Sequence, residues 1–293
     1  MTRLPGLNET GRLDRVVLKH ASDAFVSRRD IAAQWCALNF TAAPDFDRAV
    51  AEYDAFARII TDAGVDVFWL PRDDRVGLDS IYARDATALV PDGLVSGSMG
   101  KARRSSEPGV QLTALVSAGV QIAGHIGPPG RLEGGDVVWL DATTVAVGRG
   151  YRTNDDGIAQ FARFAGPDVT CITVPLPHWR GPDDVFHLMS IISPVDADLA
   201  VVYAPLLPVP FRDLLVARGV QFVEVPDEEF ASMGTNVLAL GPRRCVMVEG
   251  NPETRRRLEA AGAEVIEYAG REISVKGGGG PTCLTRPLVR AGI

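Results

Sequence analysis

Short runs rich in Val, Leu and Ile recur along the chain in pairs, and each pair is followed by a helical pattern and one more short run. In the first such unit, strands are expected at Ala86–Val90 and Leu94–Val95, on either side of a turn at 91–93. A helix is expected over Glu107–Ala118, followed by a strand at Val120–Ile122. The predicted repeating unit is therefore strand, strand, helix, strand.

The same order returns three more times. The second unit opens at Asp136–Leu140, the third at His187–Ile192 and the fourth at Asn236–Leu240. In each, a second strand, a helix and a third strand follow. In the second unit they are expected at Thr144–Gly148, Asn154–Ala165 and Val169–Val174, and in the third at Leu199–Tyr203, Phe211–Arg218 and Val220–Val223. In the fourth they are expected at Cys245–Val248, Pro252–Ala261 and Glu264–Tyr268. Asn251 is the predicted N-cap of the last of these helices. A fifth unit shows only its opening strand, Cys283–Val289.

The N-terminal region supplies the elements that the fifth unit lacks. A strand is expected at Arg15–Leu18 and another at Val65–Leu70. Between them, apolar positions from Phe46 to Ile60 recur with helical spacing, and the pattern ends at Gly64. The fifth unit is thus predicted to combine strands from both ends of the chain, which brings those ends close together.

The units start at positions 86, 136, 187, 236 and 283, so their separations are 50, 51, 49 and 47 residues. A unit of this size cannot bury its apolar face alone, and repeats of this kind pack around a common axis. We therefore expect an α/β fold with five ββαβ blades in a single domain spanning residues 1–293. A doubly wound sheet is disfavoured because it lacks such hairpins, and no strand here leads into a GxGxxG motif.

The composition narrows the class of partner. The chain of 293 residues is 46% apolar and carries 30 basic and 37 acidic residues, for a net charge of −7, so disorder and a nucleic-acid surface are both disfavoured. No apolar run approaches the roughly 18 residues of a membrane helix, and the N-terminus becomes polar too early for a signal peptide. We expect a cytoplasmic protein with no membrane partner. The four cysteines are scattered as expected for reduced thiols: Cys36, Cys171, Cys245 and Cys283.

Polar side chains gather where each unit opens. These positions are Asp85, Glu133, Asp136, His187, Thr235, Asn236 and Cys283. Any one of them has a structural explanation, such as a turn cap or a buried thiol. Their coincidence at equivalent positions favours a shared function, because rotational repetition brings equivalent strand ends to the same end of the axis. We expect one central pocket that holds carboxylates, an imidazole and a thiol.

Cys283 is the predicted nucleophile of this pocket. It follows four glycines at 277–280, which allow the backbone to approach a ligand closely. A thiolate is a competent nucleophile, and the His187 imidazolium or a bound cation would lower the pKa of the thiol. The remaining cysteines are interpreted as packing residues.

A guanidinium suits such a pocket because it is planar, permanently charged and rich in N–H donors. Asp85 and Glu133 can bind it in bidentate fashion and hold its central carbon against the sulfur. Arg152, together with Arg103 or Arg104, is expected to hold an anionic group at the far end of the ligand, such as the α-carboxylate of an amino acid. The expected partner is a small guanidino amino acid.

At these residues the sequence resembles the guanidino-group-modifying superfamily with the pentein fold, in particular the dimethylarginine dimethylaminohydrolase branch. The resemblance covers nearly the whole chain. Its motifs are Leu78-Asp79-Ser80-Ile81-Tyr82-Ala83-Arg84-Asp85, Leu132-Glu133-Gly134-Gly135-Asp136, Tyr151-Arg152-Thr153-Asn154, Phe186-His187-Leu188-Met189-Ser190 and the Gly-rich segment before Cys283.

The resemblance implies a cysteine hydrolase that converts an N-methylated arginine to citrulline and a methylamine through a covalent thiouronium. Cys283 would attack the guanidinium carbon, and His187 would protonate the departing amine and then deprotonate water. Glu133 is expected in the catalytic set. Asp79, Asp85, Asp136, Arg152 and either Arg103 or Arg104 are expected in the substrate-binding set.

Two departures from the family pattern bear on the substrate. Arginine and agmatine deiminases, which resemble this chain, carry an Asp two residues after the histidine, where Met189 stands here. An apolar side chain there favours N-methylated substrates. Arg84 occupies a position where dimethylaminohydrolases usually have an acid, and in this respect the chain resembles the deiminases.

Alternative functions on the same scaffold are arginine deiminase, citrulline ureidase and amidinotransferase activity. An alternative of another class is a catalytically silent guanidinium-binding protein, although all the chemical groups are retained. The segment Gly97–Ala102 lacks the features of a phosphate loop, and no GxSxG elbow is present. The four histidines show no paired ligand spacing, so neither a metal nor a cofactor is expected.

Overall fold

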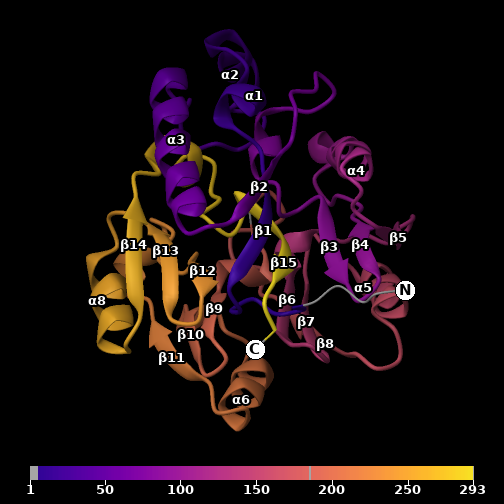
Figure 1. The fold of residues 1–293 in the computed structure, drawn as a ribbon, viewed down its shortest axis with the longest axis vertical. Coiled ribbons are helices and arrows are strands. Elements are labelled where there is room, and N and C mark those ends of the chain that lie inside the picture. The colour runs from indigo at the N-terminus through magenta and orange to yellow at the C-terminus, as the bar shows by residue number, and fades with distance from the viewer. Residues whose placement is uncertain (1–5, 185, 293) are drawn as a thin grey trace.

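The strands of the computed structural model, which describes residues 6–184 and 186–292, form five separate three-stranded sheets around one centre (Figure 1). The strands are β1 (Leu13–Leu18), β2 (Asp66–Trp69), β3 (Thr87–Val90), β4 (Gly93–Ser96), β5 (Ile122–His125), β6 (Val137–Asp141), β7 (Thr144–Arg149), β8 (Thr170–Pro175), β9 (Ile192–Asp196), β10 (Leu199–Val202), β11 (Gln221–Glu224), β12 (Leu238–Gly241), β13 (Arg244–Val248), β14 (Glu264–Tyr268) and β15 (Thr285–Arg290). The predicted five-bladed α/β architecture is confirmed.

Four of the sheets have one design. In each, an antiparallel hairpin is followed by a helix, and a third strand then pairs in parallel with the second strand of the hairpin. The sheets are β3–β5, β6–β8, β9–β11 and β12–β14. A right-handed crossover through a helix is the usual way to return a strand in parallel, which explains why each unit needs its helix.

The fifth sheet joins the two ends of the chain. Strand β1 pairs antiparallel with β15 and parallel with β2. Beyond these strands, Asn8 donates a hydrogen bond of 3.1 Å to the carbonyl of Ala291, so the N- and C-terminal segments lie side by side, as predicted.

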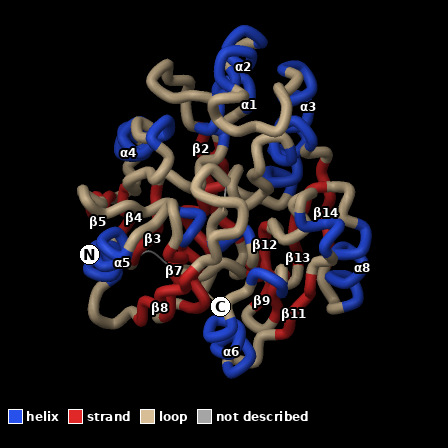
Figure 2. The backbone as a smooth tube through the Cα atoms, turned by 180° about the vertical axis from the view of Figure 1, so that it is seen from behind, coloured by secondary structure: helices blue, strands red, loops and turns tan. Residues whose placement is uncertain are grey.

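The helices cover the outside of this ring of sheets (Figure 2). They are α1 (Ala21–Phe25), α2 (Arg28–Gln34), α3 (Phe46–Asp62), α4 (Glu107–Ser117), α5 (Asp155–Ala165), α6 (Val209–Ala217), α7 (Asp227–Phe230) and α8 (Pro252–Ala260). Helix α5 begins where the side chain of Asn154 accepts the N–H of Gly157 at 2.9 Å, and it ends at Gly166 with φ of 86°. Its buried face, which includes Phe161, packs into the apolar cluster between sheets.

Two local expectations were wrong. The opening strand of the third unit starts at Ile192 rather than at His187, because the Ser190 hydroxyl accepts the N–H of His187 at 3.0 Å and closes a short 3-10 turn first. Asn251 flanks α8 but its side chain does not cap it. The Glu229 carboxylate accepts the first N–H groups of that helix instead, from Glu253 and Thr254 at 2.8 Å each.

No helix in the described ranges has the length and apolar character needed to cross a membrane.

Candidate active site

The polar residues that open the five units lie in short irregular segments just before the first strand of each sheet. Glu133 precedes and Asp136 ends the 3-10 turn before β6, and His187 precedes the turn before β9. Asp85 lies just before β3, and Cys283 just before β15. The sheets hold these segments at one end of the axis, so residues distant in sequence meet.

Glu133 and His187 are in direct contact where these segments meet. The carboxylate Oε2 lies 2.7 Å from Nε2 of the imidazole, and the Glu133 side chain is fully buried. Its Oε1 accepts the backbone N–H groups of Gly100 at 2.9 Å and Lys101 at 3.3 Å. Although burial raises the pKa of Glu133, the hydrogen bond and charge of His187 and the charge of Arg152 lower it far below its ordinary value. Glu133 is therefore an anion that orients the imidazole.

The imidazole of His187 is surrounded by acids. Burial lowers its pKa, but the carboxylates of Asp85, Asp136 and Glu133 outweigh burial and raise the pKa to about 9. Asp136 also fixes the backbone here, since its Oδ1 accepts the N–H of Leu188 at 2.9 Å. Burial raises the pKa of Asp136 itself to about 6. At neutral pH His187 is an imidazolium, which suits a group that must donate a proton.

The Cys283 sulfur is held by Asn236. The Nδ2 of Asn236 lies 3.3 Å from Sγ, and Oδ1 of Asn236 accepts both the N–H of Thr282 at 3.0 Å and its hydroxyl at 2.8 Å. Burial and the charge of Asp85 raise the pKa of the Cys283 thiol, and the hydrogen bond from Asn236 opposes them. Asn236 opens the fourth unit, at the position equivalent to the other site residues. The repeat therefore predicted that Asn236 lies in the site, but it did not predict a role for this residue.

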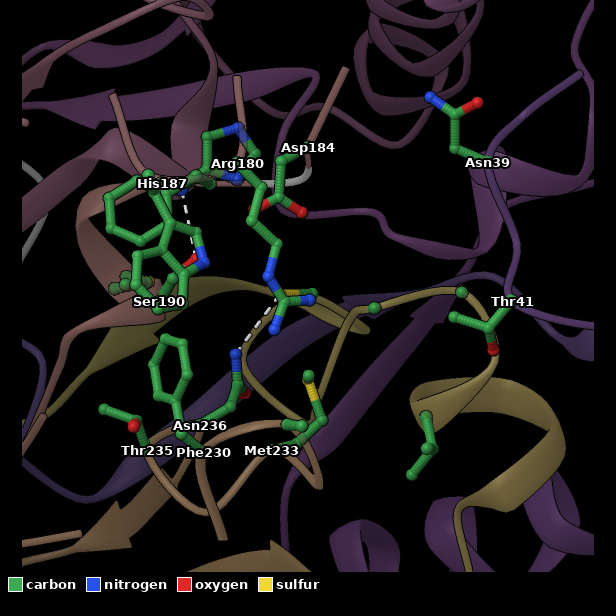
Figure 3. Close-up of a pocket in the computed structure, with 18 of the residues that line it drawn as sticks. Asn39, Thr41, Arg180, Asp184, His187, Ser190, Phe230, Met233, Thr235 and Asn236 are labelled. Atoms are coloured by element: carbon green, nitrogen blue, oxygen red, sulfur yellow. Dashed lines mark hydrogen bonds between the residues drawn. The ribbon is translucent and has the colours of Figure 1, made fainter. Parts of the chain in front are cut away.

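Cys283 and His187 line the same two cavities. The larger has a volume of about 270 Å³, and its lining includes Arg180, Asp184 and Ser190 besides His187 (Figure 3). The smaller, of about 10 Å³, is lined by most of the predicted residues. Its lining includes Asp79, Asp85, Arg104, Arg152, His187 and Cys283. Glu133 and Asp136 line neither cavity, because they lie behind the imidazole.

Of the arginines predicted to bind substrate, the two that are buried, Arg104 and Arg152, are paired with carboxylates of the protein. Arg104 donates to Asp85 at 2.6 Å and grips Glu107 through Nε and Nη2 at 2.8–3.1 Å. Arg152 donates to Glu133 at 3.2 Å. Arg103 is exposed and lines neither cavity. The structure thus places the predicted carboxylate-binding arginines in the wall of the site or outside it, where Arg104 and Arg152 orient the acids.

Asp79 is also paired. Its Oδ2 lies 2.6 Å from Nζ of Lys101, which donates as well to the carbonyl of Leu38 at 2.6 Å. Lys101 was not among the predicted residues. No periodic pattern marks it, because it lies in the irregular segment between β4 and α4, and only the three-dimensional arrangement brings it to Asp79.

An unpaired cation stands at the mouth of the large cavity. Arg180 is exposed and has no hydrogen bond or ion pair among the described residues, and its guanidinium lies 5.4 Å from the centre of the Trp179 ring. Figure 3 shows its side chain extending into the cavity toward Asn236. Asp183 and Asp184 line the same mouth. These residues lie in a connecting loop outside the repeat, so no periodic pattern marks them.

One group of residues in the described chain has the types that bind metals. The ligand atoms of Asp85, Glu133 and His187 lie within 4.8 Å of one another. However, Nε2 of His187 is bonded to Glu133, and the guanidinium groups of Arg104 and Arg152 already neutralise the two acids. A cation would have to displace these contacts against two neighbouring positive charges, so the donor set does not fit a metal ion.

Five three-stranded sheets around a thiol, an imidazole and carboxylates define a pentein of the guanidino-group-modifying superfamily. The family model described as N,N dimethylarginine dimethylhydrolase, eukaryotic, matches residues 37–290, and the chain belongs to that family.

Relatives and solved structures agree with this assignment. The arginine deiminase of Mycobacterium avium is 33% identical over 190 residues, which cover 54% of this chain and 46% of the deiminase. The dimethylarginine dimethylaminohydrolase of Pseudomonas aeruginosa, a cysteine-to-serine variant complexed with citrulline, has a TM-score of 0.75 at 21% identity, over 95% of this chain and 99% of the other.

A third similar structure is the product-bound N-terminal domain of the arginine dihydrolase ArgZ from Cyanobacteria, with a TM-score of 0.80 at 16% identity, over 94% of this chain and 98% of that domain. At these identities the two structures show the shared fold. The chain spans only about half the length of the M. avium deiminase, at 46%. Relatives of this chain thus include guanidino-group hydrolases and deiminases.

Proposed function

We propose that this protein hydrolyses the guanidinium group of an N-methylated arginine, giving citrulline and a methylamine, with Cys283 as nucleophile and His187 as acid and base. One observation carries the proposal: the thiol held by Asn236 at 3.3 Å and the imidazole held by Glu133 at 2.7 Å line the same cavities. A nucleophile and a proton donor, each positioned by a further side chain, are the parts that a covalent displacement needs.

Asp85 provides the contact for the guanidinium. Its Oδ2 is bonded to Arg104, while Oδ1 has no hydrogen-bond partner within the described chain and lies 3.9 Å from Nδ1 of His187. A buried carboxylate oxygen without a donor is a strong acceptor for a guanidinium N–H. The substrate cation would then lie beside the thiol and lower its pKa, which offsets the effect of burial on Cys283.

The first half of the reaction forms a covalent bond to sulfur. The thiolate electron pair attacks the guanidinium carbon, and the C=N electrons move onto nitrogen. His187 gives its proton to the substituted nitrogen, the C–N bond breaks and the methylamine leaves with that bonding pair. The product of this half is a thiouronium on Cys283 and a neutral imidazole.

Water completes the second half. Neutral His187 removes a proton from water as the oxygen attacks the thiouronium carbon, and the C–S bond then breaks with its electrons returning to sulfur. The proton left on the attacking oxygen is released to solvent, the neutral ureido product leaves, and both side chains regain their starting charges. Glu133 stabilises the imidazolium in each half, since its charge lies 2.7 Å away.

Met189 supports an N-methylated substrate. Its side chain is buried and lines the large cavity beside His187. A thioether offers no acceptor for a second pair of guanidinium N–H groups, whereas it packs well against methyl groups. At the other end, Arg180 faces an α-carboxylate, and Asp183 with Asp184 face an α-ammonium group.

Arginine deiminase activity is the second candidate, and the similarity to the M. avium deiminase favours it. Arg84, the other deiminase-like feature of the sequence, does not bear on the choice, since its side chain pairs with Glu9 at 2.7 Å and lines neither cavity of the site. The two candidates differ only in the group that leaves.

Product analysis separates them. The purified protein is incubated with asymmetric dimethylarginine, monomethylarginine, arginine, agmatine and citrulline, and dimethylamine, methylamine, ammonia and ureido products are measured separately. We expect dimethylamine and citrulline from the dimethylated substrate in preference to ammonia from arginine. Cys283→Ala should abolish turnover, whereas Cys36→Ala, at an exposed thiol, should not change it. Full turnover by the Cys283→Ala variant would overturn the mechanism, and a preference for arginine would establish the deiminase.

A further inference from the structure

Glu107 is a buried acid to which the reaction described above gives no role. It is the first residue of α4, and its side chain is 6% exposed. Asp155 holds the same position in α5, and its side chain is 75% exposed. An acid in the first turn of a helix interacts favourably with the helix dipole from the surface, so the dipole does not explain why Glu107 is buried.

Glu107 is buried because it binds Arg104. Its Oε1 accepts Nε of the guanidinium at 3.0 Å, and its Oε2 accepts Nη2 at 2.8 Å. A different nitrogen of the same guanidinium, Nη1, donates to Oδ2 of Asp85 at 2.6 Å. One cation is therefore shared by two buried acids, of which only Asp85 lines the small cavity of the site.

The contacts of Arg104 leave it no freedom to turn. Besides Glu107, Nη2 reaches the backbone carbonyls of Asp79 and Tyr82 at 3.2 Å each. A guanidinium fixed by acceptors on several sides presents Nη1 to Asp85 in one geometry. The other oxygen of Asp85, Oδ1, has no hydrogen-bond partner within the described chain. The network thus orients Asp85 with one oxygen occupied and the other free.

Glu107 also determines how much charge Asp85 can offer to a cation. Without it, Arg104 and Asp85 would form a neutral pair. With it, the three groups carry one net negative charge, and in a buried site this charge acts strongly on a neighbouring cation. The need for it is clear from the lining of the small cavity, where Lys101 and Arg152 add positive charge.

The charge of Glu107 changes near neutral pH. Burial raises its pKa to about 7, although the charge and hydrogen bonds of Arg104 lower it, and the charges of Asp79 and Asp85 raise it further. Lys19, whose charge also interacts with Glu107, lines a cavity of about 20 Å³ with it. Glu107 is an anion above pH 7 and becomes neutral below it, so the site should bind a cation more tightly at pH 8 than at pH 6.

We propose that Glu107 is a positioning residue that acts through Arg104, holding Asp85 in place and leaving its negative charge available to the guanidinium of the substrate. The inference rests on the proposed function, because it concerns the same cation-binding oxygen. It has a consequence for product release. The ureido product is neutral, so the charge that Glu107 maintains favours the substrate over the product at this position.

Comparison of a cationic and a neutral ligand tests the inference. Dissociation constants are measured by calorimetry at pH 8 in the Cys283→Ala variant, which prevents turnover, and in the Cys283→Ala/Glu107→Gln double variant. The ligands are citrulline and whichever of dimethylarginine and arginine binds more tightly, and they share the same amino-acid end. We expect Glu107→Gln to weaken binding of the guanidino ligand about tenfold or more and to leave that of citrulline unchanged.

A matched control and the contrary outcomes make the test specific. Asp155→Asn removes an acid from the first turn of another helix and should change neither constant. Equal weakening of both ligands by Glu107→Gln would show a merely structural role, and no change in either would show no role, so both results overturn the inference alone. Absence of binding of both guanidino ligands to the Cys283→Ala variant would overturn the proposed function as well.

A titration that retains Glu107 decides the question even if Glu107→Gln fails to fold. The carboxyl carbon of Glu107 is followed by NMR in the Cys283→Ala variant as pH is varied. A bound cation favours the anionic carboxylate, so the guanidino ligand should lower the pKa of Glu107 from about 7, and citrulline should not. Equal pKa values with the two ligands would overturn the inference.

Discussion

Glu133 and His187 are joined by a 2.7 Å contact between Oε2 and Nε2, with Asp85 on the other side of the ring at 3.9 Å from Nδ1. The imidazole is thus held between two acids that favour its charged form. Glu133→Gln keeps the shape and removes the charge, so the pKa of His187 should fall and turnover should decrease about 100-fold or more. Steady-state kinetics with NMR titration of the imidazole measures both. Glu253→Gln, at a half-buried position of α8 whose partners are Arg256 and Arg257, is the control, and an unchanged His187 pKa in Glu133→Gln would contradict this account.

The His187 charge also sets a pH dependence. The folded pKa of about 9 lies above the ordinary value of 6.5, so the stabilisation from protonation is complete below pH 6.5 and is lost as pH rises toward 9. Proton donation to the leaving amine should be lost over the same range. We expect kcat/KM to fall above about pH 9. By NMR, one of the four histidines should titrate near that pH, and its signal should be absent from the His187→Asn variant. A histidine spectrum in which every ring titrates near pH 6.5 would rule this out.

Met189 should control the choice between methylated and unmethylated substrates. Met189→Asp places an acceptor in the cavity wall, where it can bind guanidinium N–H groups that methyl groups would replace. We expect the ratio of kcat/KM for arginine to that for dimethylarginine to rise about tenfold or more. Met189→Leu conserves the apolar volume and should leave the ratio unchanged. Equal ratios in the Asp and Leu variants would show that this position does not select the substrate.

Arg180 should recognise the carboxylate end of the substrate. A charge-assisted hydrogen bond contributes about 1.5–3 kcal/mol, so Arg180→Ala should raise KM for a substrate with an α-carboxylate about tenfold or more and leave KM for a decarboxylated analogue unchanged. Arg212→Ala is a matched control, because Arg212 is also exposed and lies 5.7 Å from the centre of an aromatic ring, that of Phe222. If Arg180→Ala instead lowered KM for both substrates, the side chain would be an obstruction at the mouth and not a ligand.

Chelators should leave the activity intact. Asp85 and Glu133 are paired with Arg104 and Arg152 at 2.6 and 3.2 Å, so a metal ion at these acids and His187 would have to displace contacts with two guanidinium groups. Turnover is measured after prolonged treatment with EDTA and with phenanthroline, followed by addition of zinc. Loss of activity with the chelator and recovery with zinc would show that the three residues do bind a metal ion.

The fold could be predicted to a large extent because the hairpin, helix and third strand of each unit leave a local pattern that repeats about every 50 residues. Boundaries set by side-chain contacts were harder to predict. The hydrogen bond to the Ser190 hydroxyl makes β9 begin later than predicted, and Glu229 caps the helix that Asn251 was expected to cap. Neither contact has a periodic signature.

In the candidate site, too, the features set by the repeat could be predicted and those set by individual side-chain contacts could not. Repeat position brought Asp85, His187 and Cys283 together, because equivalent strand ends meet at the axis. Contacts between side chains of different loops could not be predicted from the sequence. The pairing of Arg104 with Glu107 and the exposed position of Arg103 depend on how the segment at 102–107 folds back over the site.

The closure of the ring by β15 carries a consequence for biosynthesis. Cys283 lies two residues before this strand, which pairs with β1. A nascent polypeptide still attached to the ribosome can form the earlier blades, but Cys283 reaches His187 only after β15 emerges and pairs with β1. The nucleophile of the proposed mechanism is therefore assembled in the last folding step of the ring, and a translation intermediate without β15 would have no paired groups to react with a guanidine.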